Sequence, residues 1–220
     1  MLIAEEYLLL TMRDDGRSTV SSRDTGVAGA LLCELASREE VMVDERGRLR
    51  LVGTGSTGDE VLDEALVRCA DKEGRKPKDA LAHIGKGMPR QLLERLARAE
   101  VVQERPTSAF GVRMWSAWPL VDTTHRDALR TELVRVLRHA EQPDARTGSL
   151  VSLLQATDAW GTALPREHRQ GLSGREISRA AKEIAEGRWA SDAVARAVAE
   201  VSAAAAAVVV AVSADGGASS

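Results

Sequence analysis

Basic residues flank a proline in the middle of the chain, at a spacing that suits phosphate binding. Lys86 stands three residues before Pro89, and Arg90 follows the proline directly. Because the N–H group of the first helical residue has no partner within the helix, Pro89 predicts a helix start. Such a start attracts anions through its dipole and its unpaired N–H groups, and neighbouring cations add charge-assisted hydrogen bonds. We therefore expect Lys86, Pro89 and Arg90 to converge on one phosphate group.

An anionic phospholipid headgroup presents such a phosphate at a membrane surface. Each basic side chain near an anionic bilayer contributes about 1 kcal/mol, so two of them form a weak anchor. Phe110 lies among small residues in a predicted turn and has no obvious core to join. An apolar tip beside a basic pocket can insert as a membrane wedge. A second interpretation is that Phe110, Trp115 and Trp118 pack on the protein or against another subunit.

Two other functions fit the same stretch of sequence. Two short helices followed by a hairpin, from Lys76 to Trp118, resemble a winged helix, whose second helix enters a DNA groove. In that interpretation four basic residues face phosphates: Lys86, Arg90, Arg95 and Arg98. Glu94 and Glu100 interrupt this face, and the net charge of −3 opposes nucleic-acid binding. The third interpretation is a scaffolding homo-oligomer without lipid affinity, formed through the hairpin that contains Phe110 and Trp115.

Enzymatic chemistry finds little support in the motifs. Residues Gly53 to Gly58 match the G-x-G-x-x-G pattern, but the strand before them fits the second arm of a hairpin and no second apolar strand follows the next helix, so the dinucleotide-binding unit is incomplete. The four histidines are dispersed without metal-ligand spacing: His83, His125, His139 and His168. We expect no enzyme, no metal and no cofactor.

Composition and periodicity indicate the elements that position these residues. Aromatic residues make up only 3% of the 220 residues, which favours a helical core over a sheet. We expect a mainly α-helical fold, a single compact domain over residues 1–214 in which amphipathic helices surround central buried ones. Two short β-hairpins and a small-residue tail over residues 215–220 complete the prediction.

The helices are predicted from their apolar spacing and their caps. Asp24 is expected to cap a central helix that ends near Ser37, and Ser173 with Glu176 forms a capping box. From Thr124 to Ala140 an apolar stripe leaves Arg126 and Arg130 off it. The other predicted elements are a short buried segment at Leu8–Leu10, hairpins over 41–51 and 101–115, and helices around 62–74, 77–84, 89–96, 148–159 and from 191.

The sequence predicts no export and no membrane span. The first twelve residues carry two glutamates where a secretory signal needs an apolar stretch after basic residues. Ala203 to Val212 is an apolar run of about half the roughly 20 residues that a bilayer requires. Cys33 and Cys69 lie in apolar helical patterns, which suits buried free thiols. We expect a cytoplasmic protein that binds the inner face of the membrane peripherally.

The order of these segments resembles the Golgi phosphoprotein 3 family. The resemblance rests on the opening IAEEYLLLTMRDDGR, the helix GALLCELASREEVMVDERGRLRL, the segment GMPRQLLERLARAEVVQE with its hairpin to WPLVD, the helix HRDALRTELVRVL and the close RAAKEIAEGRWASDAVARAVAEV. It extends from residue 2 to about residue 212. More specifically, the sequence looks like the bacterial branch that is common in actinobacteria, which agrees with arginine supplying 25 of the 30 basic residues.

The resemblance implies a non-enzymatic peripheral membrane protein that binds phosphatidylinositol 4-phosphate. In the family, two basic residues of the headgroup pocket correspond to Lys86 and to Pro89, beside which Arg90 stands. The pocket arginine corresponds to Ala28 and the pocket tryptophan falls near residues 18–19, while Arg23 could reach in from the preceding loop. The family's hairpin for self-association and membrane contact corresponds to residues 101–115. We do not expect the Golgi trafficking of eukaryotic members to transfer.

Overall fold

The computed structural model describes residues 1–18, 23–53, 55–109, 112–139, 141–187 and 198–207, with only the backbone for 107–109 and 112–115. The predicted fold class is confirmed, because helices dominate and the strands form two small antiparallel sheets. The phenylalanine at 110 and the tail over 215–220 lie outside the described residues, as do the side chain of Trp115 and the start of the last predicted helix.

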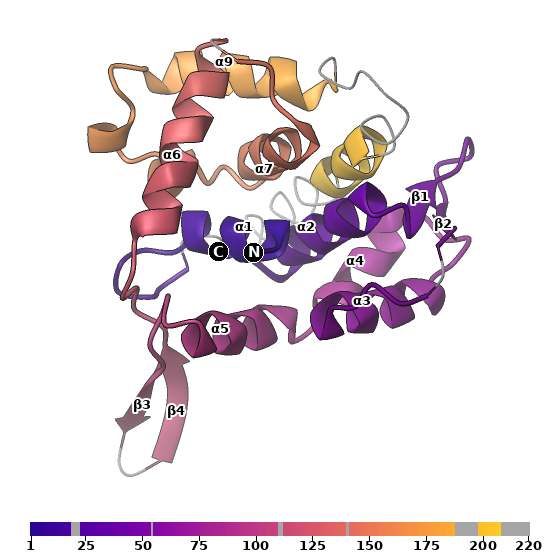
Figure 1. Ribbon diagram of the computed structural model, residues 1–220, viewed down its shortest axis with the longest axis horizontal. Coiled ribbons are helices and arrows are strands. Elements are labelled where there is room, and N and C mark those ends of the chain that lie inside the picture. Colours follow the sequence, from indigo (N-terminus) through magenta and orange to yellow (C-terminus); the bar gives the residue numbers. More distant parts are fainter. Residues whose placement is uncertain (19–22, 54, 110–111, 140, 188–197, 208–220) are drawn as a thin grey trace, which may run out of the picture.

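Two helices form the central layer (Figure 1). Helix α1 (Ile3–Thr11) is buried along its whole length, and α2 (Arg23–Ser37) is buried from Gly26 to Ala36. Leucine and alanine side chains make both helices apolar on every face, which is typical of helices that are buried on all sides. Helix α2 already includes Arg23, so Asp24 lies in its first turn and is not its cap.

One flank of this layer holds three shorter helices, α3 (Glu60–Ala70), α4 (Pro77–Gly85) and α5 (Met88–Arg98). Both prolines occupy the first turn of their helices, as predicted, although α5 begins at Met88 and Pro89 is its second residue. The side chain of Asp59 caps α3 by accepting from the N–H groups of Val61 and Leu62. Each helix buries one apolar face against α1 or α2.

The opposite flank holds α6 (Thr124–Leu137), α7 (Ala145–Ala156) and α9 (Gly174–Ala185). The capping box of Ser173 and Glu176 at the start of α9 is confirmed. Between α7 and α9 lie two short elements that periodicity does not reveal, α8 (Trp160–Ala163) and the 3₁₀ turn η1 (Arg166–His168). Residues 198–207 are also helical, and Ala205 approaches Gly29 of α2.

The predicted apolar stripe of α6 is buried except at its first residue, Ala128, which is exposed. Arg126 and Arg130, which were expected off the stripe, are buried as well. The buried face of the helix is therefore wider than predicted and includes two arginines. Arginine tolerates this position because its long stem is apolar and its head can be paired with acceptors from other segments.

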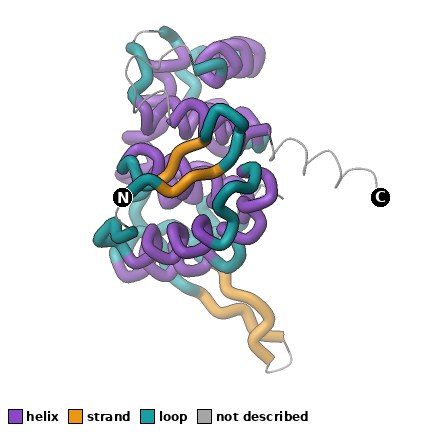
Figure 2. Tube along the Cα trace, turned by 90° about the vertical axis from the view of Figure 1, so that its right-hand side faces the viewer, coloured by secondary structure: helices purple, strands orange, loops and turns teal. Residues whose placement is uncertain are grey.

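Two antiparallel hairpins complete the fold. Strands β1 (Val41–Val43) and β2 (Leu49–Leu51) form the first hairpin as predicted. Strands β3 (Arg105–Ala109) and β4 (Val112–Ala117) form the second. Its first strand was predicted too early, because Val101 and Val102 precede β3 and most of the predicted turn at 106–111 belongs to that strand. The β3–β4 hairpin projects from the helical body in two perpendicular views (Figures 1 and 2). Among the described residues, every helix is too short or too polar to cross a membrane.

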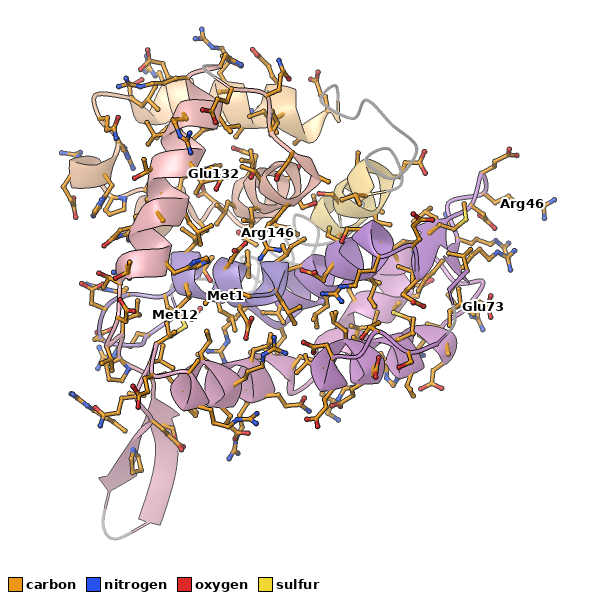
Figure 3. All side chains as sticks on the ribbon, viewed as in Figure 1. Met1, Met12, Arg46, Glu73, Glu132 and Arg146 are labelled. Carbon is orange, nitrogen blue, oxygen red and sulfur yellow. The ribbon has the colours of Figure 1, made fainter. Side chains whose placement is uncertain are left out.

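Buried charges connect the central layer to both flanks. Glu6 of α1 accepts from Nε of Arg146 on α7 at 2.8 Å, and its other oxygen lies 3.0 Å from Nε2 of His125 on α6. Figure 3 shows Arg146 between α7 and α1. Glu5 pairs with Nε of Arg95 on α5 at 3.0 Å. These acids are buried without a large penalty because each has a cationic partner.

Candidate functional site

Three helix ends meet where the sequence predicts phosphate binding. The end of α4 contacts the start of α2 so closely that a Cβ added to Gly85 would lie 2.2 Å from the carbonyl oxygen of Asp24. The same Cβ would lie 3.3 Å from the Cβ of Ala28. Only glycine permits this approach. The α4–α5 junction, which we define as residues 85–90, is therefore packed against the first turns of α2.

Lys86 caps the end of α4, directly after Gly85, with its backbone held in place. Its carbonyl oxygen accepts from Nη1 of Arg68 on α3 at 2.6 Å, and the same nitrogen donates to the carbonyl of Ile84 at 2.9 Å. Gly87 follows with a φ of +78°, a conformation that glycine adopts without strain. The Lys86 side chain is exposed, and among the described residues no ion pair involves it.

Arg68 is a positioning residue that the sequence analysis missed. Its guanidinium satisfies carbonyl groups at the end of α4, which otherwise lack partners within the helix. Glu64 of the same helix pairs with Arg68, and its second oxygen accepts from Nε2 of Gln91 on α5 at 2.7 Å. The spacing of Glu64 and Arg68 would have revealed their pair within one helix. Nothing in the sequence shows that Arg68 also reaches α4.

The start of α5 offers fewer N–H donors than the sequence suggested. Pro89 is buried and has no N–H group, and the N–H groups of Arg90 and Gln91 both donate to the carbonyl of Gly87, at 3.2 and 3.4 Å. Arg90 is exposed, and its Nε lies 2.8 Å from Oε1 of Glu94. An exposed pair of this kind exchanges readily with solvent and with other anions. Cationic side chains, more than backbone donors, therefore dominate this end of the helix.

The first turn of α2 brings a further cation to the junction. Arg23 is half-buried, and its Nε lies 3.9 Å from the carboxylate of Asp24, at the limit of an ion pair. Because Asp24 touches Gly85, the backbone of Arg23 lies near Lys86. Ala28, which contacts the Gly85 position, is fully buried and contributes no charge. Thr19 and the rest of 19–22 lie outside the described residues.

The winged-helix interpretation loses one of its four phosphate contacts. Arg95 points into the protein, where Nη1 lies 2.5 Å from Asp59 and Nε lies 3.0 Å from Glu5. Although burial alone would lower it, these carboxylates raise the pKa of Arg95. Arg95 therefore connects α5 to α1 and to the start of α3, and it is not available to a nucleic acid.

The glycine-rich segment at 53–58 also has a structural role. A Cβ on Gly53 would lie 1.9 Å from a carboxylate oxygen of Glu40, so the chain turns tightly around that acid. The helix that follows carries its own anion at its start, because Asp59 caps α3. A pyrophosphate would compete with that carboxylate for the same N–H groups. Among the described residues, no three histidine, cysteine or acidic side chains gather as a metal site would require.

The position of Trp118 favours packing over membrane insertion. Trp118 is buried at the base of the β3–β4 hairpin. Its neighbours along the chain are held by a bridge between Val102 and Leu120. The roles predicted for Phe110 and Trp115 stay predictions, since the structure does not describe those side chains.

Comparison with protein families agrees with this architecture. Residues 3–201 match the family described as Golgi phosphoprotein 3 (GPP34). The chain belongs to this family. The family is non-catalytic and is associated with phosphoinositide-containing Golgi membranes. A comparison with individually curated proteins found no match. Membership in the Golgi phosphoprotein 3 family directs attention to the α4–α5 junction, because the positions expected to contact a headgroup meet there.

Proposed function

We propose that this protein docks reversibly on anionic membranes by holding a phospholipid headgroup at the α4–α5 junction, with phosphatidylinositol 4-phosphate as the implied ligand. The observation that carries the proposal is the close packing of Gly85 against Asp24, because it brings the helix ends that carry Arg23, Lys86 and Arg90 near one another. Two of these ends are helix starts, whose dipoles attract negative charge. Family membership supports a role at phosphoinositide-containing membranes.

The placement of the β3–β4 hairpin agrees with a membrane that contacts the α4–α5 junction. In Figure 1 the hairpin leaves the end of α5 and extends away from the body on the side where α5 lies. Helix α5 has 11 residues, so its start and its end, from which the chain continues to the hairpin, are separated by roughly 16 Å. A membrane that meets the hairpin can therefore also meet the start of α5. Insertion of Phe110 and self-association through this hairpin are parts of the proposal.

The number of basic side chains at the junction sets the expected strength of membrane binding. Lys86 and Arg90 near an anionic bilayer contribute about 1 kcal/mol each, which gives weak and reversible binding. Self-association through the hairpin would add affinity by avidity, without any new contact to lipid. We also propose a cytoplasmic protein of the bacterial branch that binds the inner face of the membrane.

Co-sedimentation with vesicles tests the function. Vesicles of phosphatidylcholine alone are compared with vesicles that carry graded fractions of phosphatidylinositol 4-phosphate or phosphatidylglycerol. Binding should rise with anionic lipid, and Lys86→Ala with Arg90→Ala should weaken it about thirtyfold, the equivalent of roughly 2 kcal/mol. Stronger binding to phosphatidylinositol 4-phosphate than to phosphatidylglycerol at equal charge would support headgroup recognition.

A matched control variant distinguishes binding at the junction from non-specific binding due to the protein's positive charges. Arg179 and Lys182 are exposed on α9, which lies on the opposite flank in Figure 1. Their double alanine variant removes the same two positive charges and should keep wild-type binding. Equal losses in both double variants, or equal binding to neutral and anionic vesicles, would refute a headgroup site at the junction.

A further inference from the structure

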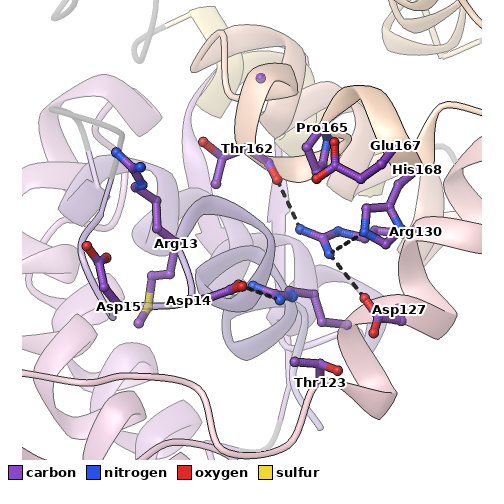
Figure 4. A pocket seen from close by; sticks show the side chains of 13 residues that line it. Arg13, Asp14, Asp15, Thr123, Asp127, Arg130, Thr162, Pro165, Glu167 and His168 are labelled. Atoms are coloured by element: carbon purple, nitrogen blue, oxygen red, sulfur yellow. Dashed lines mark hydrogen bonds and ion pairs between the residues drawn. The ribbon is translucent and has the colours of Figure 1, made fainter.

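A second cationic region lies in a pocket far from the junction in sequence. The pocket has a volume of about 740 Å³ and is enclosed by the loop at residues 12–15, the start of α6, and the segment from α8 to η1 (Figure 4). A pocket of this size accommodates a small organic molecule. Three arginines line it, Arg13, Arg126 and Arg130. The proposed membrane site uses none of them.

Arg126 is buried with most of its hydrogen-bonding capacity unused. The residue is 3% exposed, and Nη2 donates to Oδ1 of Asp14 at 2.7 Å. Its Nε and Nη1 atoms are closed to solvent and have no hydrogen-bond partner within the described structure. A buried donor without a partner costs free energy, and a charged donor costs more than a neutral one. Two of the three nitrogens of this guanidinium therefore await an acceptor.

Arg130, one turn further along α6, is fixed in the pocket wall. Its Nε donates to the carbonyl of Ala163 at 3.0 Å, and its Nη2 donates to the carbonyl of Thr162 at 3.3 Å. Its Nη1 lies 3.1 Å from Oδ1 of Asp127 and 3.3 Å from Nε2 of His168. Because a guanidinium only donates, Nε2 of His168 accepts and the imidazole proton resides on Nδ1. Burial and the positive charge of Arg126 lower the pKa of Arg130.

Three acids of the pocket lie nearer to solvent than Arg126 and Arg130, whereas Arg13 is exposed and the half-buried Asp127 pairs with Arg130. The side chain of Asp14 is 83% exposed, although its backbone is fixed by the N–H group of Leu120, which donates to the Asp14 carbonyl at 3.1 Å. Asp15 and Glu167 are also exposed. The buried part of the pocket thus holds two arginines and one paired carboxylate, and its rim holds three carboxylates beside Arg13, which suits a ligand with an anionic group at one end and hydrogen-bond donors at the other.

We propose that this pocket binds a small phosphate monoester that carries amine or hydroxyl groups. The phosphate approaches Arg126, whose ion pair is with the exposed Asp14, while Arg130, already paired with Asp127, adds positive charge to the pocket wall. The amine or hydroxyl groups meet the carboxylates of the rim. Asp14 acts as an internal competitor, because its carboxylate occupies Arg126 while the pocket is empty and must be displaced when the phosphate binds.

Titration calorimetry with inorganic phosphate and with O-phosphoethanolamine tests this site. The wild-type protein should bind both with a Kd of about 1 mM or tighter, and O-phosphoethanolamine more tightly because its amine meets the acidic rim. Arg126→Gln should weaken binding about tenfold or more through the loss of a charge-assisted contact. Asp14→Asn should tighten binding about threefold to tenfold, because the competing carboxylate is gone. A purely structural Arg126–Asp14 pair predicts no such gain.

Arg135→Gln is the matched control, since it removes the same charge from the same helix at an exposed position outside the pocket. Binding by Arg135→Gln should equal wild type. No phosphate binding by the wild type, or no gain in Asp14→Asn, overturns the proposal. If Arg126→Gln does not fold, Asp14→Asn still decides, because Asp14 is exposed and its variant leaves the core intact.

Vesicle co-sedimentation identifies the source of the phosphate. A soluble metabolite is the source if Arg126→Gln loses binding of O-phosphoethanolamine but keeps vesicle binding. A lipid headgroup is the source if Arg126→Gln, with Lys86 and Arg90 intact, loses binding of both O-phosphoethanolamine and vesicles. Either result supports the site, and neither depends on the proposed membrane function. Equal binding of O-phosphoethanolamine by Arg126→Gln and by the wild type refutes it.

Discussion

The two cationic regions of this protein differ in how their charges are held. At the α4–α5 junction, Lys86 and Arg90 are exposed, and the partner of Arg90 is four residues away on the same helix. In the α6 pocket, Arg126 and Arg130 are buried: Arg126 pairs with Asp14, 112 residues away in sequence, and Arg130, besides its ion pair with Asp127 on the same helix, donates to a carbonyl 33 residues away. The junction can therefore change its ion pairs at little cost in stability, whereas the pocket contributes to the fold.

This difference separates two ways of preparing a site for an anion. Exposed cations bind weakly, respond to salt and suit a surface that is engaged and released. Buried guanidinium groups are held by carbonyl groups of other elements, so they are placed before a ligand arrives and favour one geometry. Variants at each region should reveal the contrast in stability as well as in binding.

Gly85→Ala should have the largest effect on stability. The new Cβ would lie 2.2 Å from the carbonyl oxygen of Asp24, so α2 and α4 must move apart. Overpacking of this kind typically costs 1–3 kcal/mol, and we expect about 3 kcal/mol because the obstacle is backbone. Urea unfolding measures the loss.

The control for this variant is Gly161→Ala. Gly161 is exposed in α8 and has open space around its Cβ position. Alanine there should leave stability unchanged or raise it by about 0.5–1 kcal/mol, because alanine has the higher helix propensity. If Gly85→Ala behaves like Gly161→Ala, the close contact between α2 and α4 is not what assembles the junction.

Arg130→Met and Arg90→Met compare the two regions directly. Methionine keeps the apolar stem of Arg130 but leaves the carbonyls of Thr162 and Ala163 without their donor. We expect a loss of about 2 kcal/mol for Arg130→Met. Arg90→Met removes only an exposed pair with Glu94 and should change stability by less than about 0.5 kcal/mol. Thermal unfolding of both variants measures the difference, and similar values would contradict the contrast.

Local chemistry explains why much of the fold was predictable. The capping box of Ser173 and Glu176, the prolines that begin α4 and α5, and the alternation in β1 and β2 act within a few residues of one another. The short elements α8 and η1 carry too few residues for periodicity to reveal them. Lys86, Pro89 and Arg90 could be grouped because they are neighbours in sequence, and their role in phosphate binding stays a prediction.

Long-range pairing explains what the sequence could not reveal. Arginines beside an apolar stripe usually face solvent, so Arg126 and Arg130 were expected to be exposed. Their burial depends on Asp14 and on the carbonyls of α8, whose approach to α6 is a property of the tertiary fold. The same holds for Arg68, since its contact with the carbonyl of Lys86 spans 18 residues. Sites built by such contacts need the three-dimensional structure.

The pH dependence of stability provides the last test of the contrast between the junction and the α6 pocket, and its expected effect is the smallest. Although burial opposes it, hydrogen bonds from Thr123 and Arg130 and the charge of Arg130 lower the pKa of Asp127. A carboxyl whose pKa is lowered in the folded state stabilises the protein above its unfolded pKa, which is about 3.9, and loses that contribution as the pH falls through the folded value.

Asp127→Asn should therefore be less stable than wild type at neutral pH, and this difference in the free energy of unfolding should disappear below about pH 4. Urea unfolding from neutral to acidic pH measures the gap, with Glu45→Gln at an exposed turn as the control that shows none. A gap that persists unchanged at the acidic end would mean that Arg130 is held without the Asp127 carboxylate, and the α6 pocket would then owe its order to the α8 carbonyls alone.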